Sequence, residues 1–171
     1  IFAVSGVFLF LLNIRKGFMK GLALSLRPTS VIALTIPISI LGGVVLMGFT
    51  DLTLNIMTLG GLAISVGRVV DDSIVVLENV YRHMQRGESP KIAALNATRE
   101  VAAPITASTL TTIVVFAPLG FIQGLVGSFF FPFCIAVSFA LISSLIVSVT
   151  FVPVVGAFIL RPGDLSYEDA D

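Results

Sequence analysis

Residues 55 to 80 read NIMTLGGLAISVGRVVDDSIVVLENV, an apolar stretch that carries Arg68, Asp71 and Asp72 near its middle. A helix needs about 20 apolar residues to cross roughly 30 Å of hydrocarbon, so the stretch has the length of a transmembrane helix. On an insertion scale the three charged side chains near its middle cost about 8 to 10 kcal/mol, whereas its Leu, Ile and Val residues return about 4 to 7 kcal/mol. The stretch therefore needs partners that satisfy those charges, or a wet cavity beside them.

The composition of the whole chain is that of a membrane protein. Hydrophobic residues make up 56% of it and charged residues 12%, with a mean hydropathy of +1.06, far from the balance of a soluble domain. A soluble fold would have to bury several long apolar helices in one domain of 18.1 kDa, which surface-to-volume scaling disfavours. We therefore expect an all-α membrane protein, a bundle of transmembrane helices.

The apolar residues fall into blocks at 1–13, 30–49, 56–80, 103–124 and 130–160. Block 1–13 is too short to cross a membrane and the chain starts without Met, so we expect a truncated helix and a fragment of a longer protein. Residues 30–160 are predicted to hold four transmembrane helices with a connection at 81–102. Block 130–160 exceeds one span, so one of its ends should lie at the membrane interface.

Basic residues mark one side of the membrane. Of the ten Lys and Arg residues, all except Arg68 lie in 14–29, 81–102 or 161–171, whereas the connections 50–55 and 123–130 have none. By the positive-inside rule, 14–29 is a cytoplasmic or interfacial basic connection, 81–102 is cytoplasmic, and 161–171 is a cytoplasmic acidic tail. The two uncharged connections should face outward.

Local signals add detail to this plan. Ser89 as an N-cap and Pro90 at the first helical position predict a short interfacial helix that ends near Pro104. His83, in YRHMQRGES, is expected to be a solvated loop residue without a role, and Cys134 a small packing residue. Close helix packing is expected at the glycines of two blocks, namely Gly42, Gly43, Gly60, Gly61 and Gly67.

The charged centre of block 56–80 has the spacing of an interacting cluster. Arg68 precedes Asp71 by three residues and Asp72 by four, so its guanidinium can reach both carboxylates along one helix face. A self-neutralised cluster would need no further function. However, two Asp and one Arg leave one negative charge, and adjacent carboxylates resist being ionised together, so one shares or binds a proton. Intramembrane carboxylates of this kind are typical of proton relays, which makes Asp71 and Asp72 the candidate relay residues.

The stretch NIMTLGGLAISVGRVVDDSIVVLENVYR closely resembles the fourth transmembrane helix of resistance-nodulation-division (RND) efflux transporters of the hydrophobe/amphiphile class. LFLLNIR resembles the end of their second helix and ALTIPISILGGVVLM the third. ITASTLTTIVVFAPLGFIQG resembles the fifth, and FCIAVSFALISSLIVSVTFVPVVGAFIL the sixth. The chain thus resembles a fragment of one RND-type half, from a partial helix 2 to helix 6.

The resemblance implies proton-coupled antiport of amphiphilic or hydrophobic compounds across the bacterial inner (plasma) membrane, driven by the proton gradient without a cofactor. Asp71 and Asp72 match the paired aspartates that load and release the proton. Their cationic partner in the family is a Lys in the second half of the same chain, which this fragment lacks. The partners implied are the lipid bilayer, that second half, two further copies in a homotrimer, and a periplasmic adaptor.

Three further polar residues of this stretch are candidate functional residues, namely Arg68, Glu78 and Asn79. Arg68 stands where many family members carry an aliphatic residue, so it is a candidate counter-ion beside that Lys. Glu78 and Asn79 match the family's EN at the cytoplasmic end of the helix. They are either a functional polar contact or an interfacial cap, because helix ends are often simply solvated.

Other functions fit the residues less well. A metal-exporting RND transporter, or a non-transporting membrane component of the same fold, stays open as an alternative, although such relatives match the aspartate pair less closely. An intramembrane aspartyl protease needs carboxylates that face each other, whereas Asp71 and Asp72 are neighbours about 100° apart on one helix. The sequence has no nucleotide-binding, metal-site or nucleophile motif, and nothing in it indicates a nucleic-acid partner.

Overall fold

The chain is an antiparallel bundle of long helices, seen in a computed structural model that describes residues 28–50 and 52–160. A first helix covers Pro28–Gly48. It is followed by α2 (Ile56–Gln85), α3 (Pro90–Phe116), the 3-10 helix η1 (Ala117–Phe121) and α4 (Leu125–Ile159). The described part of the chain contains no strand, so the all-α prediction is confirmed. The predictions for 1–13, for 161–171 and for most of 14–29 lie outside the described residues.

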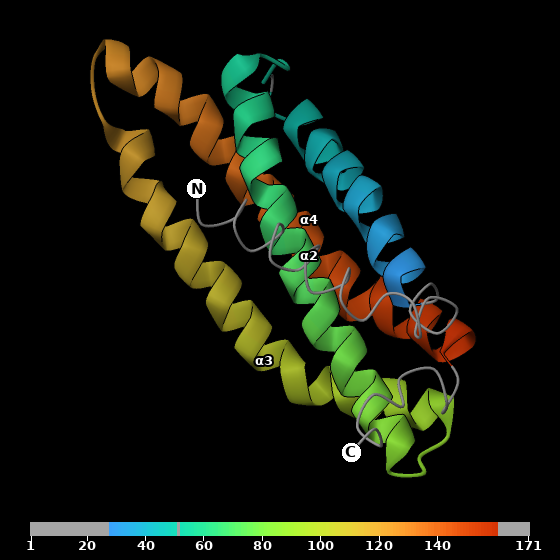
Figure 1. Ribbon diagram of the computed structural model, residues 1–171. Helices are drawn as coiled ribbons and strands as arrows, with labels where there is room; N and C mark the ends of the chain where they lie inside the picture. The colour runs from blue at the N-terminus through green and yellow to red at the C-terminus, as the bar shows by residue number, and fades with distance from the viewer. Residues whose placement is uncertain (1–27, 51, 161–171) are drawn as a thin grey trace, which may run out of the picture.

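The helices alternate in direction, as the charge distribution predicted. Figure 1 shows the connection after the first helix and the connection between η1 and α4 at one end of the bundle. The connection between α2 and α3 lies at the other end. Three helices are long and apolar enough to cross a membrane: Pro28–Gly48, Pro90–Phe121 across α3 and η1, and Leu125–Ile159. With 30 residues α2 has the length as well, but Arg68, Asp71 and Asp72 interrupt its apolar run.

The start of α2 is fixed by a capping box. The Asn55 side chain accepts hydrogen bonds from the backbone N–H groups of Met57 and Thr58, and the Thr58 hydroxyl accepts one from the Asn55 backbone. Two of the N–H groups that a helix start leaves without a partner are thereby satisfied. The end of α2 comes at Arg86, followed by Gly87 at φ 87°, a left-handed conformation that glycine adopts without strain.

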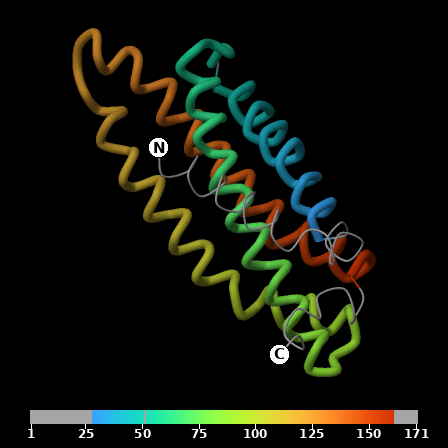
Figure 2. The backbone as a smooth tube through the Cα atoms, viewed as in Figure 1, coloured from blue at the N-terminus to red at the C-terminus, as the bar shows by residue number. Residues whose placement is uncertain are grey.

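The prediction that a helix ends near Pro104 is wrong. Ser89 is the N-cap and Pro90 the first helical residue, as expected, but α3 continues through Pro104 to Phe116. Membrane helices tolerate an internal proline because neighbouring groups can satisfy the freed backbone. Figure 2 shows a bend between the first turns of α3 and the rest, so the proline redirects the helix without ending it.

The connection predicted at 123–130 is shorter than expected. Only Ile122, Gln123 and Gly124 separate η1 from α4, because α4 already begins at Leu125. With 35 residues α4 is longer than one span requires, in agreement with the prediction for block 130–160.

Close contacts place α2 at the centre of the bundle. One group of buried side chains joins the first helix, α2, α3 and α4: Val31, Val76, Val80, Ala97 and Val152 belong to it. A second group joins the first helix, α2 and α4 through Met47, Leu62, Ala136 and Ala140.

Glycine allows the closest approach between α2 and α4. A Cβ at Gly61 would lie 2.9 Å from the Phe133 carbonyl oxygen, whereas no atom of the described residues lies within 4 Å of a Cβ at Gly60. The expected packing role therefore holds at Gly61, and Gly60 faces open space.

Candidate functional site: the charged centre of α2

The three charged residues of α2 have different surroundings. Asp72 is buried, with 3% of its surface exposed. Asp71 is exposed on the bundle formed by the described residues, and Arg68 is half-buried. Adjacent residues on an α-helix point about 100° apart, so two neighbouring aspartates can differ in burial. Burial thus separates the pair into an inner and an outer carboxylate.

Arg68 pairs with the inner carboxylate. Its Nη2 lies 3.7 Å from Oδ1 of Asp72, one helical turn further along. The same nitrogen donates a hydrogen bond to the Ser108 hydroxyl of α3. Of the two contacts that the spacing allows, the described residues make the one with Asp72 and not the one with Asp71.

Two polar atoms of this pair are buried without a hydrogen-bond partner among the described residues, namely Nε of Arg68 and Oδ2 of Asp72. A buried acceptor or donor without a partner costs about 1 to 3 kcal/mol, and more when the group is charged. A proton on Oδ2 would remove the charge of the carboxylate. Alternatively, a hydrogen-bond donor from another part of the full-length protein would satisfy this oxygen. The site is therefore incomplete on the side of Oδ2.

A hydroxyl of the first helix reaches α2 at the residue next to Asp72. Ser73, next to Asp72, shares a 3.0 Å hydrogen bond with Thr35 of the first helix and donates one of 2.8 Å to the Val69 carbonyl. Three further buried hydroxyls have no partner among the described residues: Ser39, Thr109 and Ser144. A bilayer-spanning bundle with hydroxyls in its core can accept water or exchange hydrogen bonds, which an aliphatic core cannot do.

Glu78 and Asn79 do not act as a pair. Glu78 is exposed, whereas Asn79 is buried. The Asn79 amide donates to the Ala97 carbonyl at 3.0 Å and to Oε2 of Glu100 at 3.2 Å, both on α3. Asn79 therefore ties α2 to α3 and is not a solvated cap.

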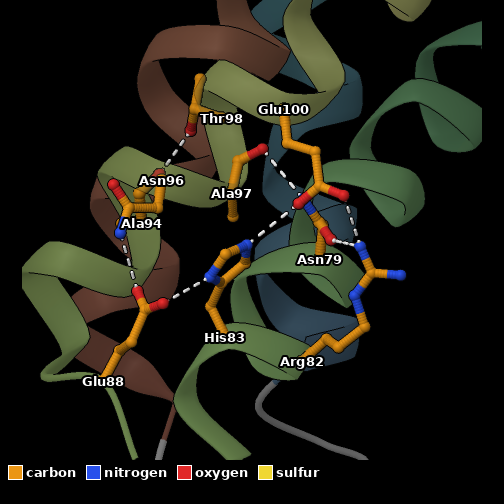
Figure 3. A network of polar contacts seen from close by, with 9 residues as sticks. All are labelled: Asn79, Arg82, His83, Glu88, Ala94, Asn96, Ala97, Thr98 and Glu100. Atoms are coloured by element: carbon orange, nitrogen blue, oxygen red, sulfur yellow. Dashed lines mark hydrogen bonds and ion pairs between the residues drawn. The ribbon is translucent and has the colours of Figure 1, made fainter. Parts of the chain in front are cut away.

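The prediction that His83 is a solvated loop residue is wrong. His83 belongs to the last turn of α2 and is 9% exposed. Its Nδ1 lies 2.8 Å from Oε1 of Glu88, and its Nε2 lies 3.0 Å from Oε2 of Glu100. Figure 3 shows the ring between the two carboxylates. The helix simply extends further than the apolar run that predicted it.

A regular spacing on α2 could have identified His83. The buried residues Asp72, Val76 and Asn79 follow one another by four and three positions, and His83 continues the series four positions after Asn79. Side chains at this spacing share one helix face. The signal was available, but the change from apolar to polar residues after Val80 concealed it. Ser108 carries no such signal, because its contact with Arg68 depends on the packing of α3.

Comparison with known proteins gives a consistent family assignment. The sequence profile of the AcrB/AcrD/AcrF family matches residues 5–169. The swarming motility protein SwrC of Bacillus subtilis is 42% identical over 156 residues, which cover 90% of this chain and 14% of that protein.

Relatives from Gram-negative bacteria are equally similar. The multidrug resistance protein MdtC of Pantoea ananatis is 43% identical over 136 residues, 80% of this chain and 13% of MdtC. An uncharacterized transporter of Haemophilus influenzae is 37% identical over 137 residues, again 80% of this chain and 13% of the relative. The chain thus spans about one seventh of the length of these proteins. By family profile, sequence identity and apolar helices together, this chain belongs to the AcrB/AcrD/AcrF family of RND transporters, multi-pass proteins of the bacterial inner membrane.

Proposed function

We propose that this chain is the proton-relay part of a secondary active transporter that exports amphiphilic or hydrophobic compounds in exchange for protons. Asp72 and Asp71 would load and release the proton, and α2 would be the helix that transmits the change of charge. The proposal needs no cofactor, because the proton gradient supplies the energy.

The observation that supports this proposal best is the half-satisfied carboxylate of Asp72. One oxygen lies 3.7 Å from Arg68 Nη2, and the other is buried without a partner among the described residues. An ionised carboxylate accepts at both oxygens, whereas a protonated one donates through one of them. Loss or gain of one proton would therefore change which neighbours Asp72 can bind. That dependence of contacts on charge is what couples a proton to a conformational change.

Arg68 and a cation from the remainder of the full-length protein would share the counter-charge of the two aspartates. Arg68 is close to Asp72 and bound to Ser108, so it can stabilise the ionised form of Asp72 and connect α2 to α3. Asp71 is exposed on the described bundle and makes no ion pair there. It is therefore available to a cation from the remainder of the full-length protein, such as the Lys that the family resemblance implies.

The hydroxyls near the aspartates would form the polar surroundings that such a change requires. Thr35 and Ser73 link the first helix to α2, and Ser39, Thr109 and Ser144 are buried with unused hydrogen-bonding capacity. A hydroxyl can turn its proton towards an ionised carboxylate and its lone pair towards a protonated one. The ionised and the protonated form of Asp72 would thus select different hydrogen-bond partners among these hydroxyls, which is how a change of charge could alter the contacts of α2.

The exported compounds and the assembly are proposed by analogy with the family. MdtC is named as a multidrug resistance protein, and we propose the same broad class of amphiphilic or hydrophobic substrates here. A homotrimer with a periplasmic adaptor would be the working assembly, in contact with the lipid bilayer.

Export from cells tests the proposal. In the full-length protein, Asp72→Asn and Asp71→Asn should each abolish export of an amphiphilic dye while leaving the protein at normal levels in the membrane. Asn keeps the size and the hydrogen bonds but cannot gain or lose the proton. Lys91→Gln is the matched control, because Lys91 is an exposed charged residue at the start of α3 and should be replaceable. Normal dye export by the Asp72→Asn protein would contradict the relay.

A further inference from the structure

A second cluster of charged residues lies at the C-terminal end of α2, distant along the helix from Asp72. It joins three parts of the chain: His83 and Arg82 at the end of α2, Glu88 in the connection, and Glu100 with Asn96 on α3. Figure 3 shows the His83 ring at its centre. The proposed relay does not use this cluster.

The geometry of the ring determines how many protons the cluster holds. Both ring nitrogens of His83 face a carboxylate oxygen, Glu88 at 2.8 Å and Glu100 at 3.0 Å. An ionised carboxylate only accepts hydrogen bonds, and a neutral imidazole has a single N–H to donate. Two such contacts therefore require either an imidazolium or a protonated carboxyl group. In both cases the cluster holds one proton more than neutral His83 between two ionised glutamates.

The remaining contacts orient the two carboxylates towards the ring. Glu88 accepts a 3.0 Å hydrogen bond from the Asn96 amide through its second oxygen. Glu100 accepts one from Arg82 at 2.9 Å and one from Asn79 at 3.2 Å. Besides its contact with His83, Glu88 thus has one further donor and Glu100 has two.

Charged side chains near His83 come from α2, from the connection and from α3. On α2 and the connection they are Arg82, Arg86 and Glu88, and on α3 they are Glu100 with Arg99 and Lys91 nearby in sequence. Neither α4 nor the helix Pro28–Gly48 contains a charged residue. The two glutamates are therefore the acidic groups that face His83 among the described residues.

We propose that His83, Glu88 and Glu100 form a proton-binding site that fastens the end of α2 to the connection and to the first turns of α3. With the proton bound, His83 bridges both glutamates and the junction is closed. When the proton leaves, one ring nitrogen presents a lone pair to a carboxylate, and that contact turns repulsive. One glutamate then separates from His83, and the end of α2 is held to α3 by fewer contacts.

The experiment is a pH titration of His83 by NMR in the full-length protein with labelled imidazole rings. The spectrum of a His83→Gln protein identifies the His83 signal by its absence. We expect the midpoint of wild-type His83 to lie above the ordinary value of about 6.5. Glu88→Gln and Glu100→Gln should each lower it, and the double variant should lower it by about one unit or more. Arg99→Gln, which removes a charge at an exposed position beside Glu100, is the control. It should not lower the His83 midpoint.

Hydrogen exchange in the same proteins tests the closure of the junction. The backbone N–H groups of Arg86 and Gly87 donate to carbonyls of His83 and Met84. The exchange of these two N–H groups, corrected for the intrinsic effect of pH, should become faster above the pH of the His83 midpoint. In the Glu88→Gln and Glu100→Gln proteins this acceleration should begin at a lower pH. A His83 midpoint at the ordinary value, unchanged by both Gln substitutions, would overturn the proposal. Neither readout depends on transport, so the proposal for His83 can fail while the proposed relay at Asp71 and Asp72 stands.

Discussion

Oδ1 of Asp72 lies 3.7 Å from Nη2 of Arg68, while Oδ2 of the same carboxylate has no partner among the described residues. Arg68 thus provides a cation for one oxygen of the buried carboxylate, and the second oxygen lacks a partner among the described residues. The question that follows is whether Arg68 is the counter-ion of the relay or only an auxiliary to a cation elsewhere in the full-length protein.

Replacement of Arg68 by Leu distinguishes the two roles. If Arg68 shares the counter-charge, as we propose, Arg68→Leu should lower export several-fold, because Asp72 then loses the only cation near it among the described residues. Dye export at equal protein level measures this. The Ser108→Ala protein is the control for the hydrogen bond alone, and it should lose less activity than Arg68→Leu. Full export by Arg68→Leu would assign the counter-charge entirely to the second half.

Two neighbouring glycines give a matched test of the packing between α2 and α4. In Gly61→Ala the new Cβ would lie 2.9 Å from the backbone oxygen of Phe133, which cannot move without shifting α4. Overpacking of this kind costs about 1 to 3 kcal/mol. In Gly60→Ala the Cβ meets nothing within 4 Å, and alanine is favoured over glycine inside a helix by about 1 kcal/mol.

Thermal unfolding of the purified full-length protein should therefore show a lower midpoint for Gly61→Ala and an unchanged or higher one for Gly60→Ala. Equal midpoints for the two variants would contradict the close approach of α2 to α4.

The His83 cluster predicts a defined pH dependence of stability. Hydrogen bonds that the protonated ring donates to Glu88 and Glu100 raise the pKa of His83 above 6.5, so this stabilisation is complete below 6.5 and is lost as the pH rises through the raised value. The hydrogen bond with His83 lowers the pKa of Glu88 below 4.5, so its contribution is complete above 4.5 and is lost as the pH falls through the lowered value. The junction should thus be most stable between 4.5 and 6.5.

The difference in unfolding midpoint between wild type and His83→Gln measures this. It should be largest in that interval and shrink as the solution becomes alkaline. A difference that grows with rising pH would have the wrong sign for an imidazolium held by two carboxylates.

The direction of the helices gives a topology that reporter fusions can check. A reporter inserted after Gly87 should be active in the cytoplasm, because its connection carries the basic residues. Reporters after Thr53 or Gln123 should be active only outside, since these connections lie at the opposite end of the bundle (Figure 1). An external reporter at Gly87 would reverse the assignment of every helix.

Hydropathy and charge spacing predicted much of this fold, and the reasons for the failures are specific. The apolar blocks predicted the helices well because a bilayer demands about 20 consecutive apolar residues whatever the partners are. Pro104 misled the prediction because a proline stops an isolated helix, whereas neighbouring groups can compensate for it in a bundle. The connection predicted at 123–130 ends already at Gly124, because the residues after Gly124 are apolar enough to start α4 at once.

The site was predicted in part. The spacing of Arg68 and Asp72 predicted their contact, which the structure contains. The spacing could not say which aspartate faces the packed side, because that depends on the rotation of α2 against three neighbours. The role of His83 depends on Glu88 and Glu100, which lie 5 and 17 positions away in the sequence. Only a fold that turns α3 back along α2 brings Glu100 to the ring.

The measurement that tests the central claim most directly is exchange of substrate for protons in vesicles that contain the full-length protein. With an imposed pH gradient, wild-type protein should move an amphiphilic dye and protons in opposite directions. The double variant Asp71→Asn with Asp72→Asn should show neither flux, although it inserts at least as well because two costly charges are gone. Dye and proton exchange by the double variant at the wild-type rate would contradict a relay at Asp71 and Asp72.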